Sequence, residues 1–407
     1  YWDIDLSRPT LPPEQLHEEL IQRFKQAVDI RMVSEVPLGA FLSGGVDSSA
    51  VVAMMSQLQS DPVNTCSIGF DVEGFDESEF AQQVADRYRT NHRIETVQQD
   101  DFALIDQLAD LYDEPFADSS AMPTYRVCEL ARKHVTVALS GDGGDELFAG
   151  YRRYQWHLQE NRLRALLPEK LRKPLFGFLG GVYPKMDWAP RIFRAKSTFQ
   201  LLGFDNVQAY HNEISIFRQD GRNRLFSQAF KQQLNGYSSL DVFRHHQANA
   251  KTDDPLQLIQ YLDMKTYLPG DILTKVDRAS MAHSLEVRVP LLDHELIEWA
   301  MRIDPSTTIN GTEGKYPFKK ALEPHLPLDV LYRKKMGFAV PLAHWFRGPL
   351  RHKLQAMLSS ERLMDSGIFE PKALDILIQQ HLKGQRDNSA SLWALLMFDS
   401  FLQKNAV

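Results

Sequence analysis

The sequence has little cysteine, no long apolar run and no excess of positive charge. Cys66 and Cys128 are its only cysteines among 407 residues, too few for a disulfide framework or a cysteine zinc site. No run of 18 apolar residues occurs, and no basic start followed by an apolar segment marks a signal peptide. The formal net charge of −7 argues against a bulk nucleic-acid partner. These absences predict a cytoplasmic protein without a nucleic-acid or membrane partner.

The sequence also begins with Tyr1 rather than methionine. We therefore expect residues 1–12 to be a linker from a further N-terminal domain. The length exceeds that of one ordinary domain, so two domains are expected within the chain itself. Their predicted bounds are 13–160, where strands and helices alternate, and 161–407, where helical patterns dominate.

Alternating short β-rich runs and helical patterns predict an α/β fold with a parallel sheet covered by helices on both faces. The predicted strands are 39–43, 63–70, 92–97 and 135–140. The predicted helices are 13–33, 48–59, 78–89, 101–112, 123–133, 146–159, 256–268, 273–284, 294–301 and 389–402. In such a sheet, ligands bind at the carboxyl ends of the strands.

Two familiar phosphate-binding patterns are missing, because neither GxxxxGK[ST] nor GxGxxG occurs. A different loop, SGGVDSS (residues 43–49), follows the first predicted strand. Gly44 and Gly45 would let the backbone approach an anion, and the serines and the following helix start supply donors. Asp47 would repel a phosphate unless a cation lay between them, so it predicts Mg²⁺. The alternative is a plain glycine turn with Asp47 as the helix N-cap.

A second polar loop, SGDGGDELFAGY (residues 140–151), follows the fourth predicted strand. Asp142, Asp145 and Glu146 repel one another unless a cation or a basic group lies among them. The alternative is an acidic surface turn that caps a helix. If both loops open at the same edge of the sheet, Asp47 and Asp145 can share one Mg²⁺.

A third segment, TEGKYPFKKAL (residues 312–322), places Lys315 after a glycine at the start of a helical pattern. A lysine here could stabilise the negative charge of a phosphoryl-transfer transition state. The alternative is an ordinary solvated lysine, as we expect for Lys319 and Lys320.

SGGVDSS resembles the PP-loop signature of the ATP pyrophosphatases, which cleave ATP to AMP and pyrophosphate. The later blocks resemble, more narrowly, the synthetase domain of the glutamine-dependent asparagine synthetases, over about residues 1–400. Asp142 stands where that family has glutamate. The pattern is also similar to the asparagine synthase-like amidotransferases of exosortase and polysaccharide gene clusters. The resemblance implies that Lys315 and Asp142 are catalytic, that Asp47 and Asp145 bind metal, and that ATP contacts Leu42, Ser43, Gly44, Gly45, Asp47, Ser48, Ser49, Ile68, Ser140 and Gly141.

The implied activity is ATP-dependent amide synthesis with Mg²⁺. A carboxylate, foremost L-aspartate, would be adenylated, and ammonia would then yield L-asparagine, AMP and pyrophosphate. The further N-terminal domain would be a glutaminase that supplies the ammonia. Two alternative functions stay open: action on another carboxylate of a surface-polysaccharide or exosortase pathway, and a non-catalytic nucleotide-binding scaffold. Assembly as a homodimer is left open as well.

Overall fold

The computed structural model describes residues 2–7, 10–12, 16–70, 76–97, 104–183, 196–333, 340–358 and 360–405. Its sheet has five parallel strands in the order β3-β2-β1-β4-β5. This arrangement confirms the predicted α/β class. The strands are β1 (Leu38–Phe41), β2 (Asn64–Phe70), β3 (Asn91–Val97), β4 (Val137–Leu139) and β5 (Glu286–Arg288).

The first four strands lie where the sequence places them, within two residues at either end. The fifth strand was missed. β5 has only three residues, Glu286, Val287 and Arg288, so its sequence carries no apolar run, and none of the three is fully buried. It forms because Val137 and Leu139 of β4 leave an open edge, against which Glu286 and Arg288 pair in register.

The chain divides into two compact units, and the first contains the whole sheet. Unit 1 comprises residues 1–112, 118–152 and 251–340. Its helices are α1 (Leu16–Met32), α2 (Val46–Leu58), α3 (Ser78–Tyr88), α4 (Leu104–Leu111), α5 (Ala121–Arg132), α6 (Gly144–Leu147), α14 (Pro255–Lys265), the π-helix η3 (Leu268–Leu273), α15 (Thr274–Met281), the 3₁₀-helix η4 (Pro290–Leu292), α16 (His294–Ala300), α17 (Pro305–Thr308), α18 (Tyr316–Leu322) and α19 (Leu328–Tyr332).

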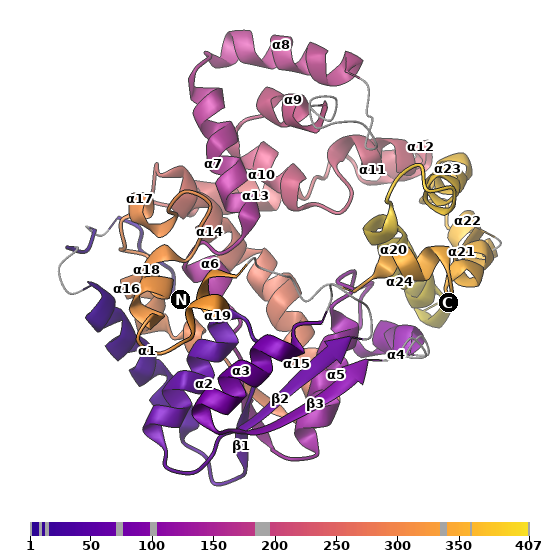
Figure 1. Ribbon diagram of the computed structural model, residues 1–407. Helices are drawn as coiled ribbons and strands as arrows, with labels where there is room; N and C mark the ends of the chain where they lie inside the picture. Colours follow the sequence, from indigo (N-terminus) through magenta and orange to yellow (C-terminus); the bar gives the residue numbers. More distant parts are fainter. Residues whose placement is uncertain are drawn as a thin grey trace. The chain divides into compact units, whose positions relative to one another are not determined.

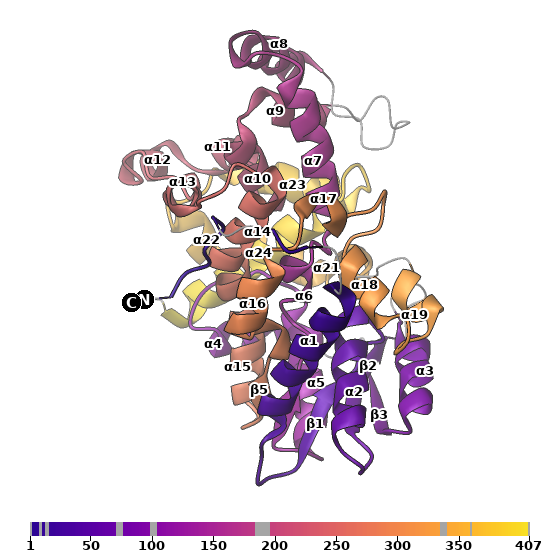
Figure 2. The same cartoon turned by 90° about the vertical axis from the view of Figure 1, so that its left-hand side faces the viewer.

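Helices cover both faces of the sheet in unit 1. α2 and α3 pack beside each other against β1, β2 and β3, and α1 lies against α2 in both views (Figures 1 and 2). α5 packs on the same three strands and contacts α15, which in turn packs on β5. The core between α5, α15 and the sheet contains Cys66, Ile68, Cys128 and Ala138, and both cysteines are free thiols.

The strand order creates a switch point between β1 and β4. The chain leaves β1 through α2 toward β2 on one side, whereas β4 has β5 on its other side. Neighbouring strands whose connections run in opposite directions leave a crevice at their carboxyl ends, which is where such folds bind ligands. Ala40 pairs with Leu139, so residues 42–45 after β1 and residues 140–143 after β4 begin at the same level. We call them the β1–α2 loop and the β4–α6 loop.

One predicted helix is divided in two. The pattern over residues 146–159 predicts a single helix, but α6 ends at Leu147 and the next helix begins at Arg152. Ala149 between them has φ of +56°, a left-handed conformation that ends helical hydrogen bonding. The prediction was wrong at this point, and the break has a role in the site described below.

Unit 2 comprises residues 113–117, 153–250 and 341–407, and its described regular structure is helical. α8 lies beside α9, and α24 packs with α20, α21, α22 and α23 (Figure 1). Its helices are α7 (Arg152–Ala165, whose first residue belongs to unit 1), α8 (Glu169–Val182), α9 (Lys196–Gly203), α10 (Asn206–Ile214), α11 (Gln219–Leu225), α12 (Gln228–Gln233), α13 (Leu240–Asn249), α20 (Leu342–Arg347), α21 (Arg351–Leu358), α22 (Glu361–Asp365), α23 (Pro371–Leu382) and α24 (Ser389–Asn405).

The predicted domains are continuous ranges of the sequence, whereas each of the two units combines several segments that contact one another in space. The division into 1–12, 13–160 and 161–407 stays a prediction. Residues 251–340, with Lys315, belong to the same unit as the β1–α2 loop. Among the described residues, no helix is both long and apolar enough to cross a membrane.

Candidate active site

The β1–α2 loop is held in a tight turn by its own polar groups. The Ser43 and Ser48 hydroxyls lie 3.0 Å apart, and the Gly45 N–H donates to Ser43 Oγ at 3.3 Å. Gly44 has φ of +70°, and a Cβ there would lie 2.6 Å from the Ala81 nitrogen, so no other residue fits. The loop is therefore a preformed glycine turn that leads into the amino end of α2.

The β4–α6 loop lies directly against the first turn of α2. A Cβ on Gly141 would be 2.6 Å from the Ser48 nitrogen, and a Cβ on Gly144 would be 2.6 Å from Asp47 Cγ. Glycines allow this close approach because they present no side chain. The two polar loops of the sequence therefore meet at the switch point, as their positions after β1 and β4 predicted.

Lys315 enters this site from a segment distant in sequence. Its Nζ forms an ion pair with Asp47 Oδ2 and lies 2.7 Å from Asp145 Oδ1. The residue is 5% exposed. The Lys315 N–H donates to the Phe148 carbonyl at 3.0 Å, in the break between α6 and α7. Asp47, Asp145 and Lys315 thus form one charged centre built from three segments, which we call the Lys315 centre.

The charges of the site shift the pKa values of its groups. Burial alone would lower the pKa of the Lys315 ammonium, but the Asp145 and Asp47 carboxylates raise it above its usual value. Lys315 therefore stays positively charged at neutral pH. Burial raises the pKa of Asp142, while the Ser140 hydroxyl, which donates to Asp142 Oδ2 at 2.5 Å, opposes that shift.

The structure corrects Asp47 as the N-cap in the first alternative and the surface position of the acidic turn in the second. The N-cap of α2 is Gly45, and Asp47 lies in the first turn with its carboxylate on Lys315. The β4–α6 loop does not lead into a surface turn, because Glu146 is 1% exposed and accepts a hydrogen bond from Tyr151 Oη at 2.6 Å. Burial and the neighbouring Asp145 carboxylate raise the pKa of Glu146 to about 7.

The segment around Lys315 also corrects a prediction. Lys319, expected to be exposed, is 8% exposed, and its Nζ lies 2.7 Å from Glu313 Oε2. Lys320 is half-buried and pairs with Glu323 at 2.8 Å. Only Lys315 of the three pairs with both Asp47 and Asp145.

The Lys315 centre suits a divalent cation in the presence of phosphate. Among the described residues, no three histidine, cysteine or acidic side chains are placed to hold a metal by themselves. Mg²⁺ commonly takes one or two protein carboxylates and completes its shell with phosphate oxygens and water. Asp47 and Asp145, brought together on one ammonium, fit that requirement.

The other predicted ATP contacts divide into two groups. Ser43, Gly44, Gly45, Ser48, Ser140 and Gly141 lie in the two touching loops or in the first turn of α2. Leu42 and Ser49 are fully buried, and Ile68 on β2 is 8% exposed and packs in the core against α5. Ser48 and Ser140, at 7% and 6% exposed, are buried as well. The contact of each of these residues with ATP stays a prediction.

A third buried lysine of unit 1, after Lys315 and Lys319, was missed. Lys275 on α15 is 7% exposed, and its Nζ lies 2.8 Å from both Asp118 Oδ2 and Ser120 Oγ. Its charge also acts on Asp142 of the β4–α6 loop. The signal was present in ADSS (residues 117–120) and LTKVDR (residues 273–278), but nothing in either stretch indicates that they meet.

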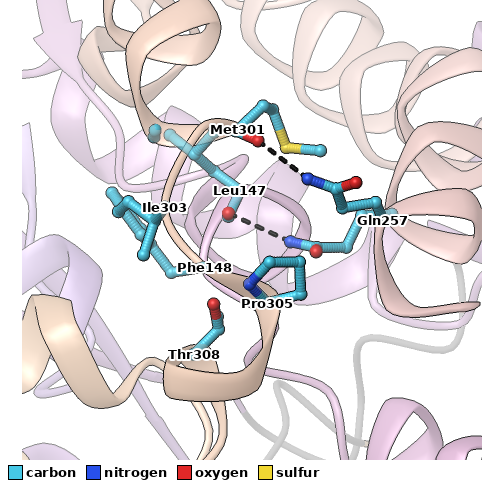
Figure 3. Close-up of a pocket in the computed structure, with 9 residues that line it drawn as sticks. Leu147, Phe148, Gln257, Met301, Ile303, Pro305 and Thr308 are labelled. Carbon is cyan, nitrogen blue, oxygen red and sulfur yellow. Dashed lines mark hydrogen bonds between the residues drawn. The ribbon is translucent and has the colours of Figure 1, made fainter. Parts of the chain in front are cut away.

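A small cavity behind α6 has no room for a substrate. It measures about 10 Å³, space for at most one water molecule. Gln257 reaches the Met301 carbonyl across it at 3.1 Å (Figure 3). Gln260 donates to the Glu146 and Leu147 carbonyls at 2.7 and 3.0 Å, which satisfies the carboxyl end of the short helix α6. The residues that line the cavity therefore hold α6 in place behind the site and do not form a substrate pocket.

Charged side chains of residues 286–293 form two ion pairs. Arg288 pairs with Glu286 at 2.6 Å, and Asp293 caps α16 and pairs with Arg31 at 3.0 Å. Arg278 is exposed on α15. Arg31 links the two pairs, because its carbonyl accepts from Arg288 Nη1 at 2.8 Å while its guanidinium pairs with Asp293.

The chain is similar to several known proteins over most of its length. The chain is 35% identical over 390 residues to "Putative asparagine synthetase (glutamine-hydrolyzing)" of Mycobacterium tuberculosis, covering 94% of this chain and 57% of that protein. It is 33% identical over 389 residues to "Asparagine synthetase (glutamine-hydrolyzing) 1" of Bacillus subtilis, covering 95% and 59%. It is 24% identical over 425 residues to "Amidase chyE" of Penicillium rubens, covering 93% and 61%. The chain thus spans somewhat more than half the length of these curated relatives.

The family model for asparagine synthase matches residues 19–403. That range includes all five strands, both loops of the switch point and Lys315. The chain therefore belongs to the asparagine synthase family.

Proposed function

We propose that this chain catalyses ATP-dependent amide synthesis by adenylating a carboxylate and passing the acyl-adenylate to ammonia. The Lys315 centre carries the proposal. A buried ammonium contacts two carboxylates from two loops at the sheet's switch point. That combination provides a cradle for phosphates, ligands for a cation and a fixed positive charge at one position.

The proposed reaction has two steps. A substrate carboxylate oxygen attacks the α-phosphorus of ATP, the bond to the bridging oxygen breaks, and pyrophosphate leaves. The nitrogen of ammonia then attacks the acyl carbon, AMP leaves, and a nitrogen-bound proton is lost to give the amide. Mg²⁺, when bound at Asp47 and Asp145, neutralises phosphate charge.

The residues of this chain position and stabilise the reacting groups. The β1–α2 loop and the amino end of α2 accept the pyrophosphate part of ATP, because glycine backbone and helix N–H groups favour anions. Lys315 keeps its charge near the site where the pentavalent phosphorus develops negative charge. Ser140 and Gly141 contact the AMP portion, and Asp142 lies near the acyl-adenylate.

L-Aspartate is our first choice of acceptor, with L-asparagine as the product. Two relatives are named asparagine synthetases that hydrolyse glutamine. A second acceptor class deserves testing, because Asp142 is one methylene shorter than the glutamate of the resembling block and one relative is named an amidase. The alternative substrate is another carboxylate, such as one carried by a surface polysaccharide.

The decisive measurement is exchange of labelled pyrophosphate into ATP with Mg²⁺ present. Exchange that depends on L-aspartate supports the asparagine proposal, and exchange only with another carboxylate supports the second acceptor class. No ATP binding by calorimetry would contradict both and favour a scaffold role. Amide formation should be assayed with ammonium and with glutamine in parallel, since the source of ammonia is itself part of the proposal. We also propose a cytoplasmic location; assembly as a homodimer stays open.

A further inference from the structure

Arg333 reaches the β1–α2 loop from the end of α19. Its Nε and Nη2 donate to the Gly44 carbonyl at 3.3 and 3.1 Å. Its Nη1 lies 2.6 Å from Glu77 Oε1, and the guanidinium lies over the Phe80 ring, 4.6 Å from its centre. The side chain is 11% exposed. Two of the three guanidinium nitrogens therefore point at one backbone carbonyl, and the third holds Glu77 beside it.

The same peptide is held at its other end. The Gly45 N–H donates to Ser43 Oγ at 3.3 Å. Because the carbonyl and N–H of a trans peptide point in opposite directions, the two contacts fix the plane of the Gly44–Gly45 peptide. A glycine pair otherwise has more backbone freedom than any other dipeptide, so holding it in one conformation is entropically costly.

We propose that Arg333 is a positioning residue that holds the Gly44–Gly45 peptide in the conformation required to receive the pyrophosphate part of ATP. The inference rests on the proposed function for its ligand. Its structural basis, two contacts that fix one peptide plane, does not depend on that function. The donors that Arg333 directs at Gly44 and Glu77 orient the loop rather than contact phosphate. The arginine thereby links the end of α19 to the turn between β1 and α2.

Arg288 offers a matched control. Its Nη1 donates to the Arg31 and Val33 carbonyls at 2.8 and 2.7 Å, and its Nε pairs with Glu286. Its side chain therefore also joins backbone carbonyls to a carboxylate, but those partners lie before β1 and in β5. Its backbone carbonyl accepts the Ser140 N–H of the β4–α6 loop at 2.9 Å, and Arg288→Ala keeps that carbonyl.

The first test measures the loop without ATP. Hydrogen exchange of a peptide covering residues 42–47 should be faster in Arg333→Ala than in the unmodified protein, and unchanged in Arg288→Ala. Equal protection in Arg333→Ala would overturn the inference regardless of what the protein catalyses.

The second test measures Mg·ATP binding by calorimetry and the KM for ATP in pyrophosphate exchange. Arg333→Ala should raise both the Kd for Mg·ATP and the KM for ATP about tenfold, equivalent to about 1.4 kcal/mol of binding free energy. The Kd and KM of Arg333→Lys should lie between those of Arg333→Ala and the unmodified protein. Lysine keeps the positive charge but lacks the forked guanidinium that spans Gly44 and Glu77. Arg288→Ala should match the unmodified protein. If the unmodified protein binds no ATP, the proposed function fails; if Arg333→Ala binds like the unmodified protein, only the present inference fails.

A double-mutant cycle separates positioning from direct phosphate contact. Arg333 and Ser43 hold opposite ends of one peptide, so Arg333→Ala with Ser43→Ala should weaken ATP binding by less than the two single effects combined. Strict additivity would make Arg333 an independent ligand of phosphate and would overturn its positioning role.

Discussion

At the residue scale, Lys315 combines three properties that rarely occur together. It is buried, it contacts two carboxylates, and its backbone has φ of +58°. A left-handed conformation costs a non-glycine residue on the order of 1 kcal/mol, so other contacts must hold it. The bond from its N–H to Phe148 and the ion pairs at its Nζ supply them. The strain lies where the proposed function requires a fixed positive charge.

Asp47→Asn should remove most of the turnover and leave the fold intact. The substitution preserves the shape of the side chain but removes the charge that pairs with Lys315 and would hold Mg²⁺. We expect pyrophosphate exchange to fall about 100-fold or more. Asp61→Asn, at an exposed position, serves as the control and should retain full activity. Persistent exchange in Asp47→Asn, with an unchanged circular dichroism spectrum, would rule out the shared metal site.

Lys275→Met should lower the free energy of unfolding by about 3–5 kcal/mol. It leaves the Asp118 carboxylate without the ammonium that now lies 2.8 Å away, and an uncompensated buried charge is costly. Urea denaturation measures the change. The double variant Lys275→Met with Asp118→Asn should recover much of the loss, because no unpaired charge remains. Equal stability of Lys275→Met and the unmodified protein would show that the pair is solvated.

At the element scale, the break between α6 and α7 and the turn before α2 shape the site. The break exposes the Phe148 carbonyl to Lys315, and Gly150 leaves space where a Cβ would meet Asp145 and Lys315. Helical periodicity continues through this stretch, so the pattern predicted one helix. The contact with residues 314–315, far away in sequence, decided otherwise.

Gly44→Ala should destabilise the protein more than the same change at Gly236. Both glycines have positive φ, +70° and +82°, but a Cβ would meet the Ala81 backbone at Gly44 and nothing within 4 Å at Gly236. Gly236→Ala should lower the free energy of unfolding by about 1 kcal/mol, because only the left-handed conformation is unfavourable there. Gly44→Ala should lower it by about 3 kcal/mol, because the clash with the Ala81 backbone adds to the conformational cost. Chemical denaturation measures the free energy of unfolding of both variants. Equal losses would mean that the turn before α2 shifts to accommodate the added methyl group.

At the scale of the whole molecule, the two units differ in how well the sequence predicts them. In unit 1 the alternation of strands and helices identified four of five strands and the class of the sheet. In the described part of unit 2, helices follow one another without a strand to order them. Periodicity therefore finds elements such as α24 but does not say which helices pack together.

Unit 2 should lose stability as the pH falls below about 6.5. His211 on α10 is 4% exposed, its Nε2 lies 2.8 Å from Ser239 Oγ, and burial together with the Arg222 charge lowers its pKa to about 4. The unfolded chain takes up a proton near pH 6.5, so stability present above that pH is lost progressively down to pH 4. The loss should reach about 3 kcal/mol.

Thermal or urea unfolding between pH 4 and 7 tests this expectation. His211→Gln, which cannot titrate, should flatten the dependence relative to the unmodified protein. His245→Gln, at an exposed position on α13, should leave the dependence as it is. The same slope in His211→Gln as in the unmodified protein would assign the effect to other groups.

By itself, the sequence determined the parallel α/β class, the places of the first four strands and the two polar loops that follow β1 and β4. Those features depend on local periodicity and on glycines and acidic residues adjacent in the chain, so they can be read along it. Tertiary structure alone decided the short strand β5 and the break after α6. It also decided the pairing of Lys315 with Asp47 and Asp145, the Lys275–Asp118 pair and the hydrogen bond from Arg333 to the Gly44 carbonyl. Each of these depends on contacts between residues far apart in the chain, and a buried charge takes its partner from whatever folding brings beside it.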